Sequence, residues 1–398
     1  MIYTFIYILR NYLGLKLSSV FAYTSSRMAL AALTGFSATL LLAPFFIHKL
    51  YELKIGESIR SEECPLLGKL HEKKKDTPTM GGLLILFSML ISLILWMDLS
   101  HSFTILLGLS TLVLGGLGAY DDYLKLKYKN SKGLSMKWKL LCQLLLSVLI
   151  IAYLVSPYLQ ESFSSVMTPP FAKERIAGQS VHLYSWEYVQ RLYVPFFKTP
   201  WNLFSGNIGL VVLAIFLFCV ICGSSNAVNL SDGLDGLACG CLITTASCLS
   251  CLSFISNHSE IAHYLNILYI EGSAEIAIYL SALVGACLGF LWFNCHPAQI
   301  FMGDTGSLAL GGVIGVSALL LKRELLLALV GGVFCIEAIS VILQIASFRW
   351  RNKKRIFLCA PLHHHFEYKG WHENKIVVRF WIVSLLLAII GLASIKFQ

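Results

Sequence analysis

The sequence predicts an all-α integral membrane protein with about ten transmembrane helices. Three observations predict this class: 57% of the 398 residues are hydrophobic, only 13% are charged, and the mean hydropathy is +0.71. Soluble proteins carry about 25% charged residues. Here the charged residues gather in short stretches between apolar runs of roughly 20 residues, the length that crosses a bilayer. These features exclude secreted, fibrous and disordered proteins.

The predicted elements follow one another in a single polytopic domain, residues 1–398. Residues 1–27 are expected to lie at the membrane interface, because Arg10 and Lys16 interrupt their apolar half and no small-residue cleavage site follows. Ten apolar runs then predict the spanning helices, at about residues 28–48, 80–97, 103–120, 138–156, 207–224, 236–255, 274–293, 307–321, 325–347 and 376–395. An even number of spans puts both termini on one side.

The distribution of basic residues between alternate loops predicts the orientation of the bundle. One set of loops, residues 49–79, 121–139, 225–235, 294–306 and 348–375, carries twenty Lys and Arg, and the opposite set carries ten. The positive-inside rule places the first set in the cytoplasm. Both termini are then external, or periplasmic, together with an expanded loop at 157–206 that we expect to form an interfacial or short structured excursion. The net charge of +9 therefore reflects the basic loops that orient the bundle in the membrane, and no nucleic-acid partner is expected.

Two adjacent carboxylates, Asp121 and Asp122, end the third predicted span and are followed by Lys125. Ionisable groups in or beside a span are costly and are functional candidates by default. Two neighbouring carboxylates repel each other and need a cation, and Mg²⁺ is the hard-oxygen partner where phosphates also bind. The alternative is a simple ion pair between Asp121 and Lys125 on one helix face.

A second polar cluster follows the fifth predicted span. It consists of four side chains spaced by three residues: Asn226, Asn229, Asp232 and Asp235. Gly233 and Gly236 predict a sharply turned start of the next span. Because a helix cap needs only one Asn or Asp, four in ten residues indicate the wall of a pocket.

A third cluster, from Asn294 to Gly306, contains Phe301 and Asp304. The glycines around Asp304 allow close approach of a ligand or metal, and Phe301 offers a ring for stacking a base. Either residue could instead mark a turn.

Two further polar segments are predicted to face the cytoplasm. His363, His364 and His365 follow a basic loop, and neighbours on a helix lie about 100° apart, so the three cannot bind one metal. They are interpreted as hydrogen-bond donors to an anionic ligand, or as a solvated polar loop. Lys74 is the middle one of three lysines that precede Thr77 and Pro78. Thr77 and Pro78 predict a helix start, and such a start behind lysines can bind an anion. The lysines could instead hold the chain at the cytoplasmic membrane surface. Glu337, inside the ninth span, has no predicted role.

Together these clusters indicate a cytoplasmic face equipped for a diphosphate and Mg²⁺. They also carry a family resemblance through five motifs in order: Thr77-Pro-Thr-Met-Gly-Gly, Asp121-Asp122-Tyr-Leu-Lys125, Asn226-Ala-Val-Asn-Leu-Ser-Asp-Gly-Leu-Asp-Gly-Leu, Phe293-Asn-Cys-His-Pro-Ala-Gln-Ile-Phe-Met-Gly-Asp304 and Ala360-Pro-Leu-His-His-His-Phe-Glu. The chain resembles the phospho-N-acetylmuramoyl-pentapeptide transferases. These are a branch of the polyprenyl-phosphate N-acetylhexosamine-1-phosphate transferases of bacterial cell-wall assembly. The resemblance covers nearly the whole chain and departs from the family at about residues 157–196.

The resemblance implies transfer of phospho-MurNAc-pentapeptide from UDP-MurNAc-pentapeptide to undecaprenyl phosphate, giving lipid I and UMP, in the bacterial inner membrane among membrane lipids. It implies that Asp304 binds Mg²⁺, with Asp121 and Asp122 beside the metal and the lipid phosphate, and Asp232 as a further possible ligand. The implied uridine-pocket residues are Lys74, Asp235, Asn294 and Phe301. The implied diphosphate and sugar surroundings are Asn226, Asn229, Asp232, Lys137, His363 and His364. Thr79 and Lys125 are further substrate-binding candidates, and a homodimer is compatible with the resemblance.

Other interpretations stay open from sequence. A sister transferase that uses UDP-GlcNAc would share most of these residues, and a nucleotide-sugar transporter would need polar groups near the bilayer midplane. The chemistry also has two routes. The lipid phosphate could attack the β-phosphorus directly, with Asp121 orienting or deprotonating it, or Asp121 or Asp122 could form a covalent intermediate.

Overall fold

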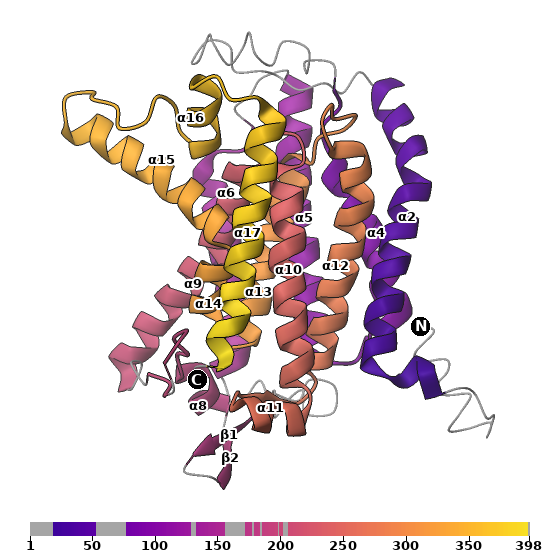
Figure 1. The fold of residues 1–398 in the computed structure, drawn as a ribbon, viewed down its shortest axis with the longest axis vertical. Coiled ribbons are helices and arrows are strands. Elements are labelled where there is room, and N and C mark those ends of the chain that lie inside the picture. The colour runs from indigo at the N-terminus through magenta and orange to yellow at the C-terminus, as the bar shows by residue number, and fades with distance from the viewer. Residues whose placement is uncertain are drawn as a thin grey trace.

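A bundle of long apolar helices forms the fold (Figure 1). The structure, a computed structural model, describes residues 19–52, 77–128, 133–155, 172–176, 179–183, 185–197, 199–201 and 206–396. Within this part of the chain, nine helices are long and apolar enough to cross a membrane: α2 (Thr24–Glu52), α5 (Ser102–Tyr128), α6 (Met136–Val155), α9 (Gly206–Ser231), α10 (Leu237–Ser256), α12 (Ser273–Asn294), α13 (Gly303–Leu320), α15 (Gly332–Trp350) and α17 (Glu373–Lys396). The predicted integral membrane class is confirmed.

Two of the ten predicted spans differ from the expectation. The run at 80–97 forms α4 (Gly81–Trp96), which has 16 residues and is shorter than the roughly 20 that a span needs. The run at 325–347 is divided into α14 (Glu324–Val330) and α15, so the prediction of one continuous helix was wrong. The division falls at Gly331 and Gly332, since two successive glycines are poor helix formers. Beyond it, α15 projects away from the bundle (Figure 1).

Helix α13 lies at the centre of the bundle, where it contacts α4, α5, α9, α10 and α14. Of its 18 residues, 89% are buried. Small residues allow this approach, because a Cβ at Gly82 in α4 would overlap the backbone of Gly306, and a Cβ at Gly118 in α5 would overlap the carbonyl of Asp304. Small residues at helix contacts bring backbones together in membranes. Both contacts fix the first turn of α13, which carries Asp304.

A buried ion pair joins α2 and α12 at the opposite end of the bundle from Asp304. Arg27 Nη2 lies 2.7 Å from Glu275 Oε1, and Arg27 Nε donates a hydrogen bond to the carbonyl of Trp96 at 2.8 Å. Glu275 Oε2 accepts the N–H of Asp98 at 3.0 Å. These contacts satisfy both buried charges, so this pair fastens α2, α4 and α12 together.

The described part of the 157–206 loop is structured and includes strands, which an all-α prediction did not contain. The smaller elements are η1 (Ser19–Ala22), β1 (Ala172–Ile176), β2 (Gln179–Leu183), α8 (Ser185–Gln190), α11 (Ser259–Leu265), β3 (Tyr269–Ile270) and α16 (Leu362–Tyr368). The antiparallel sheet has the order β2-β1-β3. Lys322 Nζ donates to the carbonyl of Val189 at 3.1 Å and pairs with Glu324 at 2.7 Å, so the loop is held against the connection between α13 and α14.

The polar motifs share one end of the bundle. Figure 1 places α16 and the start of α17 at this end, and β1, β2, α11 and the C-terminus at the other. The segments that meet at the first end are the last turn of α5, the turns before α10 and α13, and α16. The predicted interfacial segment 1–27 is described only from residue 19, and the rest of it lies outside the described residues.

Candidate active site

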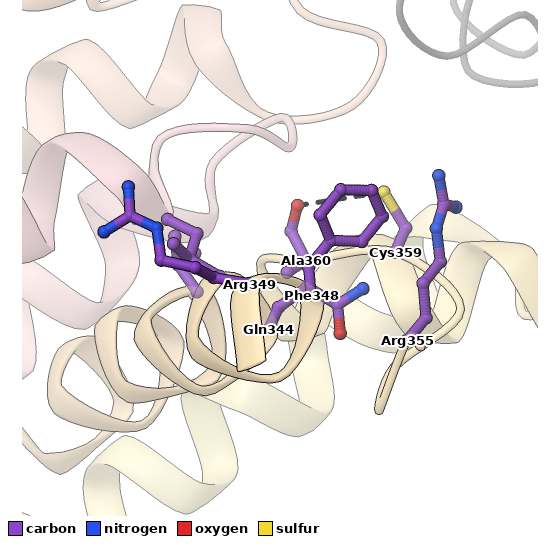
Figure 2. Close-up of a pocket in the computed structure, with 8 residues that line it drawn as sticks. Gln344, Phe348, Arg349, Arg355, Cys359 and Ala360 are labelled. Atoms are coloured by element: carbon purple, nitrogen blue, oxygen red, sulfur yellow. Dashed lines mark hydrogen bonds between the residues drawn. The ribbon is translucent and has the colours of Figure 1, made fainter. Parts of the chain in front are cut away.

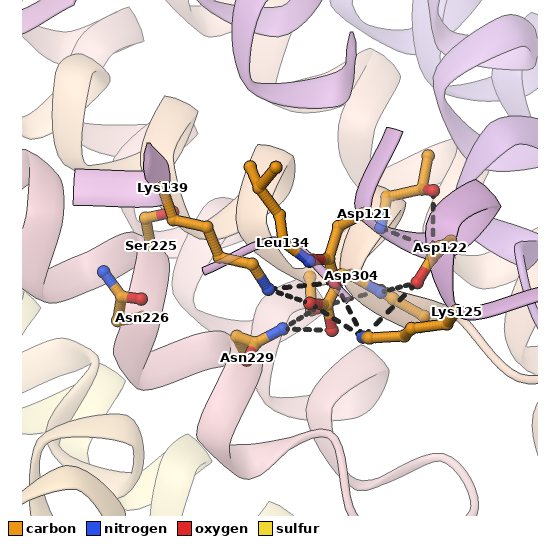
Figure 3. A network of polar contacts seen from close by, with 12 residues as sticks. Asp121, Asp122, Lys125, Leu134, Lys139, Ser225, Asn226, Asn229 and Asp304 are labelled. Carbon is orange, nitrogen blue, oxygen red and sulfur yellow. Dashed lines mark hydrogen bonds and ion pairs between the residues drawn. The ribbon is translucent and has the colours of Figure 1, made fainter. Parts of the chain in front are cut away.

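Three carboxylates from two helices form the centre of the candidate site. Asp121 and Asp122 lie near the end of α5, and Asp304 lies in the first turn of α13. One oxygen from each lies within 4.8 Å of the others. Figure 3 shows the three side chains converging with two lysines. We call Asp121, Asp122, Asp304, Lys125 and Lys139 the acidic centre.

The two lysines bridge these carboxylates. Lys125 Nζ lies 2.8 Å from Asp121 Oδ2 and 3.0 Å from Asp304 Oδ2, and Lys139 Nζ lies 2.9 Å and 2.6 Å from the same oxygens. Lys125 is also 3.7 Å from Asp122 Oδ1. Three carboxylates and two ammonium groups leave the acidic centre with a formal charge of minus one. Asp304 and Lys125 are partly exposed, so a ligand can reach the centre.

The neighbouring aspartates have different surroundings. Asp122 Oδ1 accepts the N–H of Asp304 at 3.2 Å, and Asp122 Oδ2 accepts the N–H and the hydroxyl of Thr305 at 2.9 and 2.6 Å. Asp122 thus satisfies N–H groups at the start of α13, which have no partner within the helix. Asp121 Oδ1 accepts the N–H of Leu134 at 2.6 Å. Its buried Oδ2 meets both ammonium groups without an aligned hydrogen bond.

Asp304 is oriented by the amide side chain of Asn229 from α9. Asn229 Nδ2 donates to Asp304 Oδ1 and to the Ser307 hydroxyl, both at 2.9 Å. One turn earlier, Asn226 Nδ2 donates to Gln143 Oε1 at 3.1 Å. Gln143 Nε2 donates in turn to the Ser225 hydroxyl at 3.0 Å, which links α6 to α9 behind the centre. Asn229 therefore contacts Asp304 directly, whereas Asn226 one turn earlier helps to fasten α6 to α9 (Figure 3).

The donor set of the acidic centre fits a hard divalent cation. Carboxylate oxygens are ligands that Mg²⁺ prefers, and octahedral Mg²⁺ has oxygen ligands at about 2.0–2.1 Å. Oδ2 of Asp121 is buried and has no aligned donor, and one oxygen of Asp121 lies within 4.8 Å of one oxygen of Asp304. Asp121 and Asp304 thus have the chemistry and the spacing to hold the ion together.

A second acidic group lies where α10, α12 and α17 meet. His296 Nδ1 is 2.9 Å from Asp235 Oδ2 and 3.5 Å from Glu373 Oε2. Glu373 Oε1 also accepts the N–H of Asp235 at 2.8 Å. Asn294 Nδ2 donates to the carbonyl of Ile300 at 2.8 Å, and its Oδ1 accepts the N–H of Gly236 at 3.1 Å. Asp235 and Asn294 thus shape the 294–301 loop, and both are buried.

Phe301 is fixed by the segment before α4. Its N–H donates to the carbonyl of Pro78 and its own carbonyl accepts the N–H of Gly81, both at 2.8 Å. The expected helix start at Pro78 was wrong, because α4 begins at Gly81 after Met80, whose φ of 74° is left-handed. Thr79 lies near the acidic centre: a Cβ at Gly303 would be 3.2 Å from Thr79 Oγ1.

The histidine segment forms α16. His363 is fully buried, and its Nδ1 lies 3.1 Å from Oε2 of Glu337. His364 Nδ1 lies 2.6 Å from Glu367 Oε2, and the rings of His363 and His364 are 4.2 Å apart. The alternative of a solvated polar loop was wrong, because the segment is helical and His363 is buried. The predicted donation to an anionic ligand stays a prediction. Glu337, which had no predicted role, is the partner of His363.

A groove lies beside the last turns of α15, and no residue of the acidic centre lines it (Figure 2). Its volume is about 430 Å³, and it is lined by Val341, Gln344, Ile345, Phe348, Arg349, Arg355, Cys359 and Ala360. Gln344 Oε1 accepts the N–H groups of Ile356 and Phe357 at 3.1 and 3.0 Å, which fastens the segment to α15. Arg349 and Arg355 extend outward at its two sides.

The structure brings together some of the predicted residues and leaves others apart. Asp121, Asp122, Lys125, Asn229 and Asp304 meet in the acidic centre or contact it directly. Asp232 follows Asn229 in the turn after α9 and donates its N–H to the carbonyl of Asn229 at 3.4 Å. Lys137 is exposed, and Lys74 lies outside the described residues.

Lys139 is the residue that sequence reasoning missed. A signal for it exists: Lys139, Gln143 and Ser147 recur every four residues, and the last two are buried on one face of α6. Lys137 instead shares the phase of exposed Leu141 and Leu145.

Comparisons with known proteins match the chain over the segments that form this site. The glycosyl transferase family 4 pattern matches residues 103–322, and phospho-N-acetylmuramoyl-pentapeptide-transferase signature 1 matches residues 74–86. The chain is 61% identical to the phospho-N-acetylmuramoyl-pentapeptide-transferase of Protochlamydia amoebophila (strain UWE25), over 96% of this chain and 97% of that protein. The proteins of the same name from Desulfotalea psychrophila and Thermodesulfovibrio yellowstonii are 45% identical over 96% of each chain and 43% identical over the full length of both. These matches confirm the resemblance seen in the motifs.

Proposed function

Because the chain belongs to the phospho-N-acetylmuramoyl-pentapeptide-transferase family, we propose that it transfers phospho-MurNAc-pentapeptide from UDP-MurNAc-pentapeptide to undecaprenyl phosphate. The products are lipid I and UMP. The observation that carries the proposal is the convergence of Asp121, Asp304, Lys125 and Lys139 at one end of a membrane bundle. Both substrates carry phosphate groups, and a site that holds them together needs cations to offset that charge.

Mg²⁺ is the proposed cofactor, held by Asp304 and Asp121, with Asp122 beside it and Asp232 as a further candidate ligand. When bound, it would polarise the diphosphate and offset its negative charge. Asp122 then acts mainly by positioning, since both of its oxygens accept hydrogen bonds from the start of α13. Asn229 holds Asp304 in the required direction.

We favour direct in-line attack. An oxygen of undecaprenyl phosphate bonds to the β-phosphorus, the bond from that phosphorus to the bridging oxygen breaks, and UMP leaves with the electron pair. A phosphate monoester has a second pKa near about 6, so the nucleophile is already mostly dianionic at cytoplasmic pH. Asp121 Oδ2 therefore needs only to orient the nucleophile or accept a residual proton. Lys125 and Lys139 stabilise negative charge on the departing phosphate.

The covalent route has one better candidate. A carboxylate nucleophile needs an oxygen that is not tied by aligned hydrogen bonds, and Asp122 has both of its oxygens engaged by the first turn of α13, whereas Asp121 Oδ2 has no aligned donor. Asp121 would therefore be the attacking residue in that alternative. Release of one equivalent of UMP in the absence of undecaprenyl phosphate, with the β-phosphorus retained on Asp121, would identify the covalent route.

The remaining contacts are assigned by family resemblance together with position. We assign uridine to Phe301 and Lys74, with Asp235 and Asn294 shaping the loop that carries Phe301. Thr79 is a further substrate-binding candidate near the acidic centre. The diphosphate and sugar lie toward Asn226, Asp232, Lys137, His363 and His364. These last groups lie around the same end of the bundle as the acidic centre.

The proposed location is the bacterial inner membrane, with the acidic centre on the cytoplasmic side. The described helix ends and loops at that end carry most of the basic residues, including Lys125, Lys139, Arg349 and Arg355, as the positive-inside rule requires. The lipid substrate then reaches the acidic centre from the surrounding membrane, and the nucleotide reaches it from the cytoplasm.

The test is UMP release by the purified protein in lipid nanodiscs with undecaprenyl phosphate and Mg²⁺. UDP-MurNAc-pentapeptide is offered in one sample and UDP-GlcNAc in another. Release only in the first supports the proposal. Release only with UDP-GlcNAc would overturn the substrate and keep the site, whereas silence in both would overturn the transferase.

A further inference from the structure

Glu337 is a buried carboxylate inside α15 that the transfer mechanism does not use. Its exposure is 0%, and among the described residues its ion-pair partner is His363. A charged group buried in a membrane bundle is costly unless it is paired, and such groups mark functional sites. The pairing accounts for Glu337, but it leaves the role of the paired histidine open.

Glu337 holds His363 by two hydrogen bonds. The backbone N–H of His363 donates to Oε1 at 3.1 Å, and the ring Nδ1 lies 3.1 Å from Oε2. A carboxylate that takes one ring N–H fixes both the orientation of an imidazole and the proton position on it. These two contacts therefore fix the direction in which the other ring nitrogen of His363 points.

That other nitrogen, Nε2, is buried and has no hydrogen-bond partner within the described part of the chain. It points at the turn between α9 and α10, where a Cβ on Gly233 would overlap it. The backbone of Gly233 has no positive φ, so the absent side chain is what the ring requires at this position. An unsatisfied buried polar atom is rare and calls for a ligand or another explanation.

This turn adjoins the acidic centre. Asp232 precedes Gly233 and donates its backbone N–H to the carbonyl of Asn229, whose side chain holds Asp304. His363 Nε2 thus faces a segment one helical turn beyond a residue that contacts the acidic centre. The turn that Nε2 faces is thus joined by one backbone hydrogen bond to Asn229, which contacts the acidic centre.

We propose that Glu337 is a positioning residue for the transfer reaction: it orients His363 so that Nε2–H donates to the diphosphate of the nucleotide substrate. The inference rests on the proposed function, because it takes the diphosphate as the bound anion. When both ring nitrogens of His363 carry a proton, Nδ1–H donates to Glu337 and Nε2–H is the unsatisfied donor. A side chain at Gly233 would overlap the ring at Nε2.

The first test measures the protonation of the His363 ring by NMR. Histidine is labelled with ¹⁵N in the full chain in nanodiscs, and the His363 signals are assigned by their loss in His363→Gln. Both ring nitrogens are expected to be protonated, and the Nε2 signal is expected to move when UDP and Mg²⁺ are added. A neutral ring with no proton on Nε2, or an Nε2 signal that does not move at saturating UDP, would overturn the proposal.

The second test is kinetic. Glu337→Gln keeps the size of the side chain and removes its charge, and it is expected to raise KM for UDP-MurNAc-pentapeptide roughly tenfold or more. KM for undecaprenyl phosphate should stay unchanged, a split that a general loss of folding would not give. The matched control is Ser340→Ala, since Ser340 is buried one turn along α15 and bonds only the carbonyl of Glu337.

Gly233→Ala gives an independent test. The added Cβ should lower kcat/KM for the nucleotide substrate in the wild-type background and have no further effect in His363→Ala, because the overlapping ring is then gone. An equal loss in both backgrounds, or a normal KM in Glu337→Gln, would refute the positioning role. If the wild-type protein forms no lipid I, the proposed function fails, and the ¹⁵N response to UDP still decides whether His363 binds a diphosphate.

Discussion

Replacing Lys139 with Met removes one of the two ammonium groups of the acidic centre. Lys139 Nζ lies 2.9 Å from Asp121 Oδ2 and 2.6 Å from Asp304 Oδ2, and the side chain is only 14% exposed. Solvent therefore screens these contacts little compared with a surface ion pair. Met preserves the length of the side chain, so the substitution tests charge rather than packing.

The expected loss follows from these contacts. A hydrogen bond to a charged group contributes about 1.5–3 kcal/mol. One ammonium group makes both contacts of Lys139, so the two are not additive, and a loss of about 2.7 kcal/mol corresponds to roughly 100-fold in kcat. The remaining carboxylates carry one more uncompensated negative charge. The Mg²⁺ concentration at half-maximal rate should therefore fall while kcat falls.

The assay is UMP release by the purified variants, titrated with Mg²⁺ at saturating substrates. Lys127→Met is the matched control, because Lys127 is exposed near the end of α5 and its ammonium group lies over the rings of Tyr123 and Tyr128. Lys137→Met compares the residue favoured by family resemblance, and its loss should be at least tenfold smaller. An equal loss of kcat in the Lys127 and Lys139 variants, or an unchanged Mg²⁺ requirement, would contradict a role for the charge of Lys139 in the acidic centre.

Three further substitutions test other parts of the account. Phe301→Leu should weaken UMP binding about tenfold by calorimetry, since it removes a flat ring and keeps apolar bulk, and an unchanged affinity would count against stacking. Gly82→Ala should lower thermal stability by about 1–3 kcal/mol, because the added Cβ meets the backbone of Gly306; a wild-type melting temperature would contradict the close contact of α4 and α13. Arg27→Met should destabilise the fold by about 3–5 kcal/mol in detergent, since it leaves Glu275 buried without its partner. The folded fraction of this variant should keep kcat within about twofold, because Arg27 lies at the opposite end, and a much larger fall would contradict that separation.

Local sequence patterns predicted the bundle and most of the acidic centre. Apolar runs of membrane length correspond directly to helices, and Asp121, Asp122 and Asp304 stand out because carboxylates are rare in such runs. The division of the ninth span was harder to predict, because Gly331 and Gly332 break a run whose hydropathy is continuous. Length and composition alone could not separate one helix from two.

Non-local contacts explain what sequence could not show. Asp121 and Asp122 are equivalent as neighbours in a motif, yet only Asp122 bonds the start of α13, 182 residues later in the chain. Glu337 and His363 are 26 residues apart, and their pairing depends on how α16 folds back onto α15. Lys139 could have been chosen over Lys137 by its phase on α6, but its partner Asp304 is again distant in sequence.

The most direct test of the account compares lipid I formation by wild-type protein and Asp304→Asn, each with Mg²⁺ and with excess EDTA. The substitution keeps the shape of the side chain that Asn229 and both lysines contact, and it removes the charge that the proposed metal site requires. Wild-type protein should form lipid I only with Mg²⁺, and the variant should form none while melting within a few degrees of wild type. Normal turnover by Asp304→Asn, or wild-type turnover in EDTA, would contradict a metal-dependent phosphotransfer centre at Asp304.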